Sequence, residues 1–447
     1  MRDISRRNLL GAGIGAAAAI GIAGCGTTGS AGPARAAKPH HSGAGDGGGT
    51  GGTGGKPTAT ARPAGKDVRL IGDGSTSDTG KQPHQPPPPV PLEPGETPPQ
   101  FVIFSWDGAG EVGNGLFPRF LELARDHGAA MTFFLSGVYL LPESKKTLYR
   151  PPNNPVGASD IGYLTDAHIK DTLTSLRRAW LDGHEIGTHF NGHFCGGSGS
   201  VDRWTPRQWR SEIDQAVSFV TEWRTNSGWT EIDPLPFDYR KELTGGRTPC
   251  LLGQDKLLPA VRKLGWRYDA SSPGGTQIWP DKLHGVWNLP LQAVPFPGHS
   301  FEVLSMDYNM LANQSRNSTN GMKSRYAGWR KQATEAYLGG FRRAYETNRA
   351  PFFIGNHFEQ WNGGIYMDAV EEALKGMAGK KDVRLVSFRQ FTDWLDAQDP
   401  AVLAKLRTLD VGQSPAGGWS TFLRPARKGS PQGTPNAGPK GTPAKAA

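Results

Sequence analysis

The spacing that says most about chemistry in this sequence is a pair of histidines four residues apart, His189 and His193. Gly187 and Gly192 favour a loop here rather than a helix, and a loop can still bring both rings to one ion. Two imidazoles together with one carboxylate suit zinc or another borderline divalent metal, and they leave positions open for water and substrate. The pattern predicts a metal site, with two unrelated loop histidines as the alternative.

Three more reactive residues follow or end predicted strands. Asp107 follows 101–106, Asp269 ends 266–269 and His357 follows 352–354. A fourth, Arg247, lies in the segment 245–250. In parallel α/β folds the carboxyl ends of the strands meet at one edge and carry the chemistry. We therefore expect these side chains to share one site with the two histidines.

Apolar runs alternate with amphipathic segments over about 300 residues. We expect strands at 101–106, 131–135, 185–188, 266–269, 352–354 and 384–387, and helices at 116–127, 165–181, 205–223, 256–264 and 367–377. Such alternation predicts an α/β fold, with a parallel sheet covered by helices and either open or closed into a barrel.

Between residues 101 and 397 the chain resembles the polysaccharide deacetylases of carbohydrate esterase family four, which share the NodB-type domain. The resemblance is carried by segments 104–108, 131–137, 183–189 with His193, 247–249, 268–269, 353–357 and 383–391. It implies an irregular, incomplete (β/α) barrel that removes N- or O-acetyl groups from sugar polymers. It also implies a divalent metal, which we expect to be Zn²⁺.

The sequence departs from the family motif at one position, because Trp106 stands where the family has its general base. The resemblance then makes Asp107 the metal ligand beside the two histidines. Metal chemistry can continue without a base, which typically contributes about 10²–10⁴-fold, so we expect a slow or altered enzyme. Glu111 is the nearest replacement base, with a helix-start acid as the alternative. Arg247 would orient Asp107 or an acetyl-derived oxyanion.

The resemblance also makes His357 the general acid, with Asp269 tuning its pKa. The alternative for Asp269 is a structural turn at the end of a strand. Trp361 and Trp279 lie near loop glycines and are candidates for stacking on sugar rings, although Trp more often packs in a core.

Residues 1–25 read as an export signal. Adjacent arginines at 6 and 7 precede an apolar stretch that ends in Ile-Ala-Gly-Cys25. They resemble a twin-arginine signal joined to a lipobox, in which Cys25 is lipidated, and an ordinary secreted protein is the alternative. We expect a protein anchored by lipid to the outer face of the cell membrane.

Cys195 and Cys250 are then the only other thiols, in an oxidising compartment. We expect a disulfide between them, beside the site, because each lies within three residues of His193 or Arg247. Metal ligation by both and two free buried thiols are the alternatives.

Composition divides the rest of the chain. Residues 26–100 are rich in Gly and Pro and predict a disordered linker, residues 101–423 contain all 13 Trp and form the catalytic domain, and 424–447 form a basic disordered tail. Of the formal net charge of +9, the tail contributes five Lys or Arg and no acid. This distribution argues against a nucleic-acid groove on the folded part and for loose association of the tail with anionic wall polymer or lipid.

Three functions remain in competition. The leading hypothesis is a monomeric, metal-dependent deacetylase of an acetylated polysaccharide such as peptidoglycan, chitin-like or xylan-like material. The second is a lipid-anchored carbohydrate-binding domain whose turnover was lost with its base. The third is a different metal-dependent hydrolase, acting on other amides or esters with the same fold.

Overall fold

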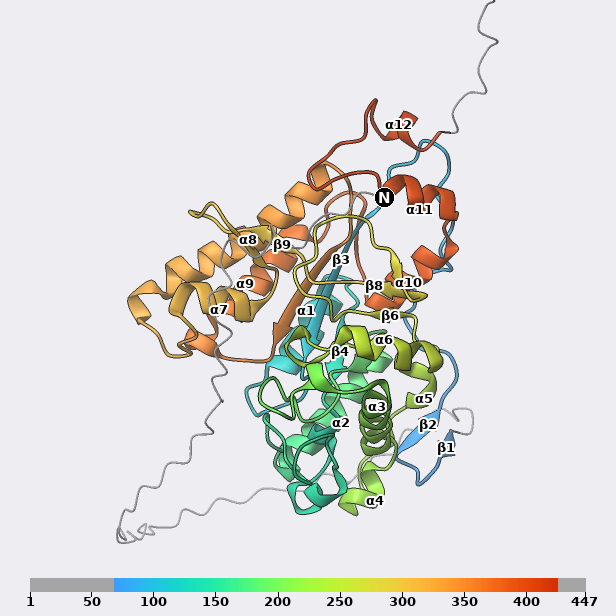
Figure 1. Ribbon diagram of the computed structural model, residues 1–447, viewed down its shortest axis with the longest axis vertical. Helices are drawn as coiled ribbons and strands as arrows, with labels where there is room; N and C mark the ends of the chain where they lie inside the picture. Colours follow the sequence, from blue (N-terminus) through green and yellow to red (C-terminus); the bar gives the residue numbers. More distant parts are fainter. Residues whose placement is uncertain (1–67, 425–447) are drawn as a thin grey trace, which may run out of the picture.

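The structure is a computed structural model that describes residues 68–424. Its centre is a five-stranded sheet in which every pairing is parallel. The strands are β3 (Gln100–Asp107), β4 (Thr132–Leu135), β5 (Glu185–Thr188), β11 (Phe352–His357) and β12 (Val383–Leu385). β3 pairs with β11 along one edge and shares its other edge between β12 and β4. The predicted parallel α/β architecture is confirmed (Figure 1).

The sheet continues into an irregular barrel that closes only through short contacts. A single bridge joins Thr188 to Gly246, and another joins Met306 to Gly355 on β11. Between them stand the short sheet of β6 (Tyr268–Asp269), β7 (Lys282–Leu283) and β8 (Val286–Asn288), and the hairpin of β9 (Ala293–Pro295) and β10 (Glu302–Leu304). The barrel is therefore incomplete, as the sequence led us to expect.

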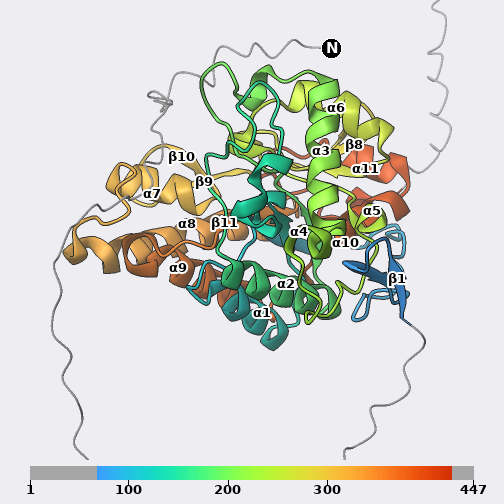
Figure 2. The ribbon, with the colours of Figure 1, turned by 90° about the horizontal axis from the view of Figure 1, so that it is seen from below.

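Helices surround the sheet, with α1, α2, α8 and α9 gathered along one side of the molecule (Figure 2). The helices are α1 (Leu116–Asp126), α2 (Asp166–Leu181), α3 (Pro206–Thr221), α4 (Trp223–Ser227), α5 (Tyr239–Glu242), α6 (Gln254–Lys263), α7 (Asp307–Ser315), α8 (Tyr326–Glu346), α9 (Trp361–Met377), α10 (Phe388–Ala397), α11 (Pro400–Leu406) and α12 (Trp419–Phe422). Short 3₁₀ turns occur at Gly137–Leu140, Glu143–Leu148, Val201–Arg203, Pro249–Leu251 and Lys323–Arg325. Among the described residues, no helix combines the length and the apolar character needed to cross a membrane.

The alternation of side chains along β3 divides the interior into two cores. Val102, Phe104 and Trp106 belong to the core that includes residues of α1 and α2, whereas Phe101 and Ile103 belong to the core that includes residues of α10. Successive residues of a strand point to opposite faces. The side chains of Trp106 and Asp107, the last two residues of β3, therefore point to opposite faces of the sheet.

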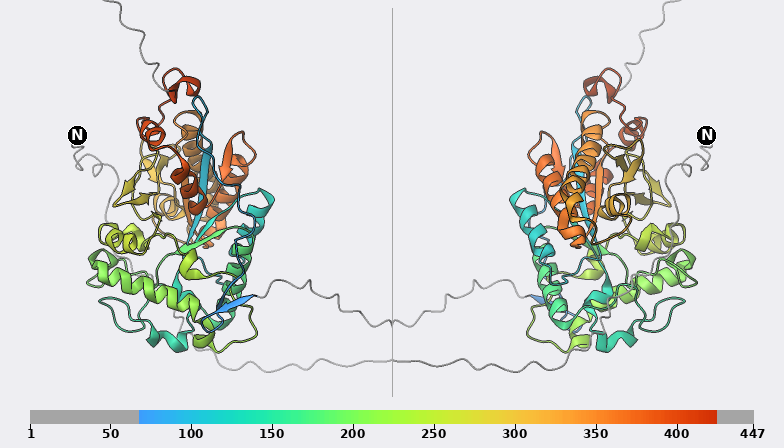
Figure 3. Two further views of the ribbon diagram at one scale, coloured as in Figure 1. Left: turned by 90° about the vertical axis from the view of Figure 1, so that its right-hand side faces the viewer. Right: turned by 90° about the vertical axis from the view of Figure 1, so that its left-hand side faces the viewer.

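The predicted start of the folded part, at residue 101, is too late. Residues 68–100 include the hairpin of β1 (Arg69–Ile71) and β2 (Thr76–Asp78), and this segment is bonded to the domain. The side-chain amide of Gln82 donates to the carbonyl oxygen of Trp180 (2.9 Å), and the indole of Trp223 donates to that of Ser75 (2.8 Å). A segment too polar for a core of its own can still be ordered by hydrogen bonds to a preformed surface. Figure 3 shows the blue hairpin against the flank of the domain.

The other terminal predictions fall on residues that the structure does not describe. They are the signal at 1–25 with Cys25, the part of the linker before residue 68, and the tail after residue 424.

Candidate active site

The backbone brings four of the predicted residues together at the carboxyl ends of the strands. His357 lies opposite Asp107 in the pairing of β11 with β3. The bridge between Thr188 and Gly246 places the residues that follow each of them, His189 and Arg247, side by side. Arg247, His189 and Asp107 are 0%, 3% and 4% exposed, so their polar groups must find partners within the protein.

A buried ion pair joins Asp107 to Arg247. Nη1 of Arg247 donates to Oδ1 of Asp107 (2.8 Å) and to the hydroxyl of Ser105 (2.9 Å), and Nε donates to the carbonyl oxygen of Ala270 (3.1 Å). Burial alone would raise the pKa of Asp107, but the charge and hydrogen bond of Arg247, together with the nearby rings of His189 and His357, outweigh it and lower the pKa. Asp107 is thus an ionised carboxylate. Orienting it is the first of the two roles expected for Arg247.

The ring of His189 is fixed through one nitrogen. Nδ1 lies 2.8 Å from the carbonyl oxygen of Arg247, which can only accept, so we place the ring proton on Nδ1. Nε2 then carries a lone pair, and it is buried without a hydrogen-bond partner. The ring centre of His193 lies 5.1 Å from that of His189. Burial lowers the pKa of both, to about 3 for His193, so both rings are neutral and able to act as ligands.

Two residues that the sequence analysis did not single out, Tyr149 and Glu212, bind the loop that carries both histidines. The hydroxyl of Tyr149 accepts from the amide of Gly192 (2.9 Å) and donates to Oε1 of Glu212 (2.9 Å). Burial raises the pKa of Glu212 to about 7. His193 adopts a left-handed backbone (φ 59°), a strained conformation that the surrounding contacts maintain. Neither Tyr149 nor Glu212 lies near a motif, so only the tertiary structure reveals them.

His357 is bonded to Asp307, not to the predicted Asp269. Oδ1 of Asp307 lies 2.8 Å from Nδ1 of His357, and Oδ2 accepts from the His357 amide (2.7 Å). Burial alone would lower the pKa of His357. The charge and hydrogen bond of the fully buried Asp307, together with the charges of Asp107 and Glu359, outweigh this effect and raise the pKa to about 9.

Asp269 instead accepts from Ser271 Oγ (2.6 Å) and Gln254 Nε2 (2.6 Å), which is the structural alternative given above. Asp307 is a site residue that the sequence analysis missed. It follows a short strand, β10, and the bridge from Met306 to Gly355 places it beside β11.

The three predicted metal ligands do not meet as a ready-made site. Within residues 68–424, the only group of at least three candidate donors within 4.8 Å of one another is His193, Cys195 and Cys250. Asp107 is held by Arg247 and is not part of such a group. The unpartnered Nε2 of His189 and the adjacent His193 ring do fit a metal. The fit is seen for the two imidazoles, and Asp107 as the third ligand stays a prediction.

Glu111 organises the loop that precedes α1. Its Oε1 accepts from the amides of Gly113 (2.9 Å), Asn114 (3.1 Å) and Gly115 (3.2 Å). α1 begins at Leu116 and has neither a side-chain cap nor an acidic residue in its first turn. Glu111 therefore has a structural role in this loop and is not the expected acid of the first helical turn.

The tryptophans divide between core and site. The ring of Trp106 stacks on Phe358, with centres 4.5 Å apart, and its Nε1 contacts Met131 Sδ, so it faces away from Asp107. Trp279 is 1% exposed and donates to the carbonyl oxygen of Asn348, so it is a core residue and not a sugar platform. Trp361 is half-buried with its ring centre 5.5 Å from that of His357, and it remains the candidate for substrate contact.

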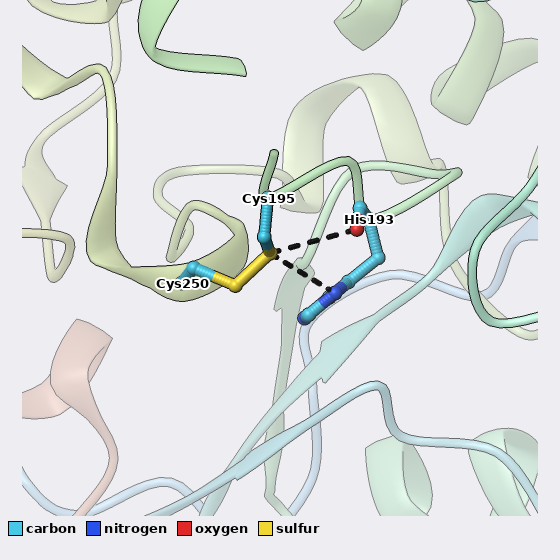
Figure 4. A group of neighbouring side chains, drawn as sticks. All are labelled: His193, Cys195 and Cys250. Carbon is cyan, nitrogen blue, oxygen red and sulfur yellow. Dashed lines mark hydrogen bonds between the residues drawn. A yellow bond between two sulfur atoms is a disulfide. The ribbon is translucent and has the colours of Figure 1, made fainter. Parts of the chain in front are cut away.

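The predicted disulfide between Cys195 and Cys250 is present, with the two Cα atoms 6.0 Å apart. Sγ of Cys195 lies 3.5 Å from Nδ1 of His193 (Figure 4). The bridge therefore ties the histidine loop to the segment that follows Arg247.

No protein-family model matches the sequence, and no curated protein matches it. Comparison with solved structures finds a protein of Mycobacterium smegmatis, provisionally assigned as a polysaccharide deacetylase, at 13% identity and a TM-score of 0.42, covering 70% of this chain and 95% of the other. The Xyl-CE4 domain of a xylanase from the hindgut metagenome of Trinervitermes trinervoides is 13% identical, with a TM-score of 0.35 and coverage of 67% and 92%. The peptidoglycan deacetylase PdaC of Bacillus subtilis is 12% identical, with a TM-score of 0.34 and coverage of 68% and 94%. Sequence identities and TM-scores this low do not establish an activity for this protein. The activity has to be argued from the residues of the site.

The structural role of Glu111 can be tested by substitution. We expect Glu111→Ala to lower the free energy of unfolding by about 1.5–3 kcal/mol, the usual contribution of hydrogen bonds to a charged group, and Glu111→Gln, which keeps an acceptor oxygen, to cost less. Urea unfolding measures both. Hydrolysis per folded molecule should be unchanged. A large loss of hydrolysis at unchanged stability would restore Glu111 as a catalytic group.

Proposed function

We propose that this protein is a hydrolase that removes acetyl groups from a polysaccharide of the cell wall or the environment. The observation that carries the proposal is the ion-paired His357 and Asp307 at the same strand ends as the Asp107–Arg247 pair and two neutral imidazoles. Acyl transfer needs an acid for the leaving group and a charged, partly desolvated setting for the carbonyl. This constellation offers both.

His357 supplies the proton in this proposal. A pKa of about 9 keeps its ring protonated at neutral pH. Nδ1 is engaged by Asp307, so Nε2 is the atom that can deliver a proton to the departing amine or alkoxide. Trp361, packed beside the ring, is placed to contact the sugar that carries the leaving group.

The two imidazoles would hold a divalent metal, for which we propose Zn²⁺. A bound metal would supply Lewis acidity and make water more acidic. The chain's own contribution is the orientation of His189 by the carbonyl oxygen of Arg247, a contact that fixes the tautomer of a ligating histidine.

Asp107 is the carboxylate left near the imidazoles once Trp106 is packed away, and we propose it as the proton acceptor. Its lowered pKa makes it a weak base, because the efficiency of a base depends on its pKa. Slow hydrolysis is the expected result.

One further function has specific support. The packing of Trp106 into the aromatic core, away from the site, favours a carbohydrate-binding domain without turnover. Both functions use the same surface, so only a measurement of turnover separates them.

Acetate release from acetylated chitooligosaccharide and from peptidoglycan tests the proposal. We expect slow release by the native protein and a fall of about 10²–10⁴-fold in His357→Ala, the usual contribution of a general acid. The exposed His299 provides the matched control, because His299→Ala should keep the native rate. Oligosaccharide binding without acetate release would reject the deacetylase in favour of the binding domain.

The pH dependence tests the pairing of His357 with Asp307. An acid with a pKa near 9 keeps its proton, and its activity, up to that pH. In Asp307→Asn the pKa should fall toward the ordinary value of about 6.5, so the alkaline limb of the rate profile should move to lower pH. Asp269→Asn is the control, since Asp269 is not bonded to His357, and the limb should stay in place. An unmoved limb in Asp307→Asn would refute the assigned acid.

We also propose that the protein is exported by the twin-arginine route and anchored through lipid on Cys25. Two acyl chains give a stable anchor, so Cys25→Ala should move the protein from the membrane fraction to the medium. Fractionation with an immunoblot measures this, with a chain ending at Arg424 as the control that removes the basic tail. Unchanged membrane association of Cys25→Ala, together with release of the shortened chain, would assign anchoring to the tail.

A further inference from the structure

We propose that reduction of the Cys195–Cys250 disulfide creates a second type of metal site, in which His193 and the two thiolates bind a soft divalent cation such as Zn²⁺. This inference goes beyond the proposed deacetylase, and it does not require that the protein hydrolyse anything.

The donors are already together. Within the described residues, His193, Cys195 and Cys250 alone form a group of three candidate ligands with all atoms within 4.8 Å of one another. Figure 4 shows the three side chains meeting, with the sulfur of Cys195 3.5 Å from Nδ1 of His193. While the sulfurs are bonded to each other they are not thiolates, and thiolate is the form that binds metal.

The distances suit tetrahedral zinc once the bond is broken. With Zn–S near 2.3 Å and Zn–N near 2.0 Å, tetrahedral ligands lie roughly 3.5–3.8 Å apart. The separation between His193 and Cys195 already has this value, so the sulfur of Cys250 makes the main movement.

The backbone can stay where it is during that movement. The Cα atoms of the cysteines are 6.0 Å apart, which leaves room for both sulfurs to reach one ion. Cys250 is exposed, so its side chain can rotate without displacing a core residue, and solvent can reach the fourth position. Two cysteines, one histidine and an open position form a known type of zinc site.

The chemistry balances with a dithiol as the reductant. A dithiol transfers two electrons and two protons to the disulfide, giving two protein thiols and an oxidised, cyclic disulfide of the reductant. Binding of the cation then releases the two thiol protons to solvent. The oxidation state of the cysteines would thereby decide whether His193 is recruited to the sulfurs.

Cobalt(II) provides the test, because thiolate ligands give it a charge-transfer absorption that imidazole and carboxylate ligands do not. The full chain is reduced with a dithiol, freed of it without air, and titrated with Co²⁺. We expect one equivalent to produce thiolate absorption in the reduced protein and none in the oxidised protein. Absence of the absorption after reduction would overturn the proposal.

Variants separate this site from the proposed catalytic one. His193→Ala should weaken cobalt binding by at least the roughly 10–100-fold that loss of a mere outer-shell partner costs. Cys250→Ser should lose most of the thiolate absorption, whereas His189→Ala should keep it, because His189 is not a ligand here. Equal affinity in His193→Ala and the native chain would also overturn the proposal. Failure of the deacetylase would leave these results untouched.

A second measurement guards against poorly folded variants. Zn²⁺ should protect both thiols of the reduced native protein from an alkylating reagent, as counted by mass spectrometry, and should not protect them in His193→Ala. Circular dichroism of each reduced variant establishes that the fold is retained. Equal alkylation with and without Zn²⁺ in the folded native protein would contradict the site.

Discussion

Arg247 connects the residues of the site through both its guanidinium and its backbone carbonyl oxygen. Its Nη1 reaches Asp107 and Ser105 on β3, its Nε reaches the residue after β6, and its own carbonyl oxygen fixes the ring of His189. Both charges of the pair with Asp107 are removed from water. Breaking such a pair typically costs about 3–5 kcal/mol, because the remaining charge stays buried and uncompensated. The buried charge of Asp107 therefore depends on this arginine.

Side chains alternate between the two faces of β3, and this alternation explains why Trp106 and Asp107 have such different surroundings. Trp106 takes its place in the aromatic cluster with Phe358 and Phe120, where a carboxylate would be buried without a partner. Asp107, one residue later, lies on the other face beside Arg247. Asp107 is therefore the acid that the end of β3 places beside Arg247.

Position along the strand also decides which acid serves His357. Asp269 ends the short strand β6, Asp307 follows the short strand β10, and both are fully buried. Asp269 is satisfied by Ser271 and Gln254, and burial raises its pKa, whereas Asp307 lies next to β11 and accepts from both the ring and the amide of His357. A carboxylate beside a histidine favours the imidazolium form, so the contact with Asp307 is what raises the pKa of His357, and Asp269 makes no such contact.

The sequence by itself determined the parallel α/β architecture, the strand ends at Asp107, His189 and His357, and the disulfide. These follow from local information: apolar runs, motif spacing, and the number of cysteines. It did not determine the order of residues 68–100, the burial of Trp279, or the partner of His357. Each of these depends on a contact between distant segments, such as the bridge from Met306 to Gly355 and the hydrogen bond from Trp223 to Ser75. Hydrogen bonds and ion pairs act over a few ångströms in space, and only the folded chain decides which residues come that near.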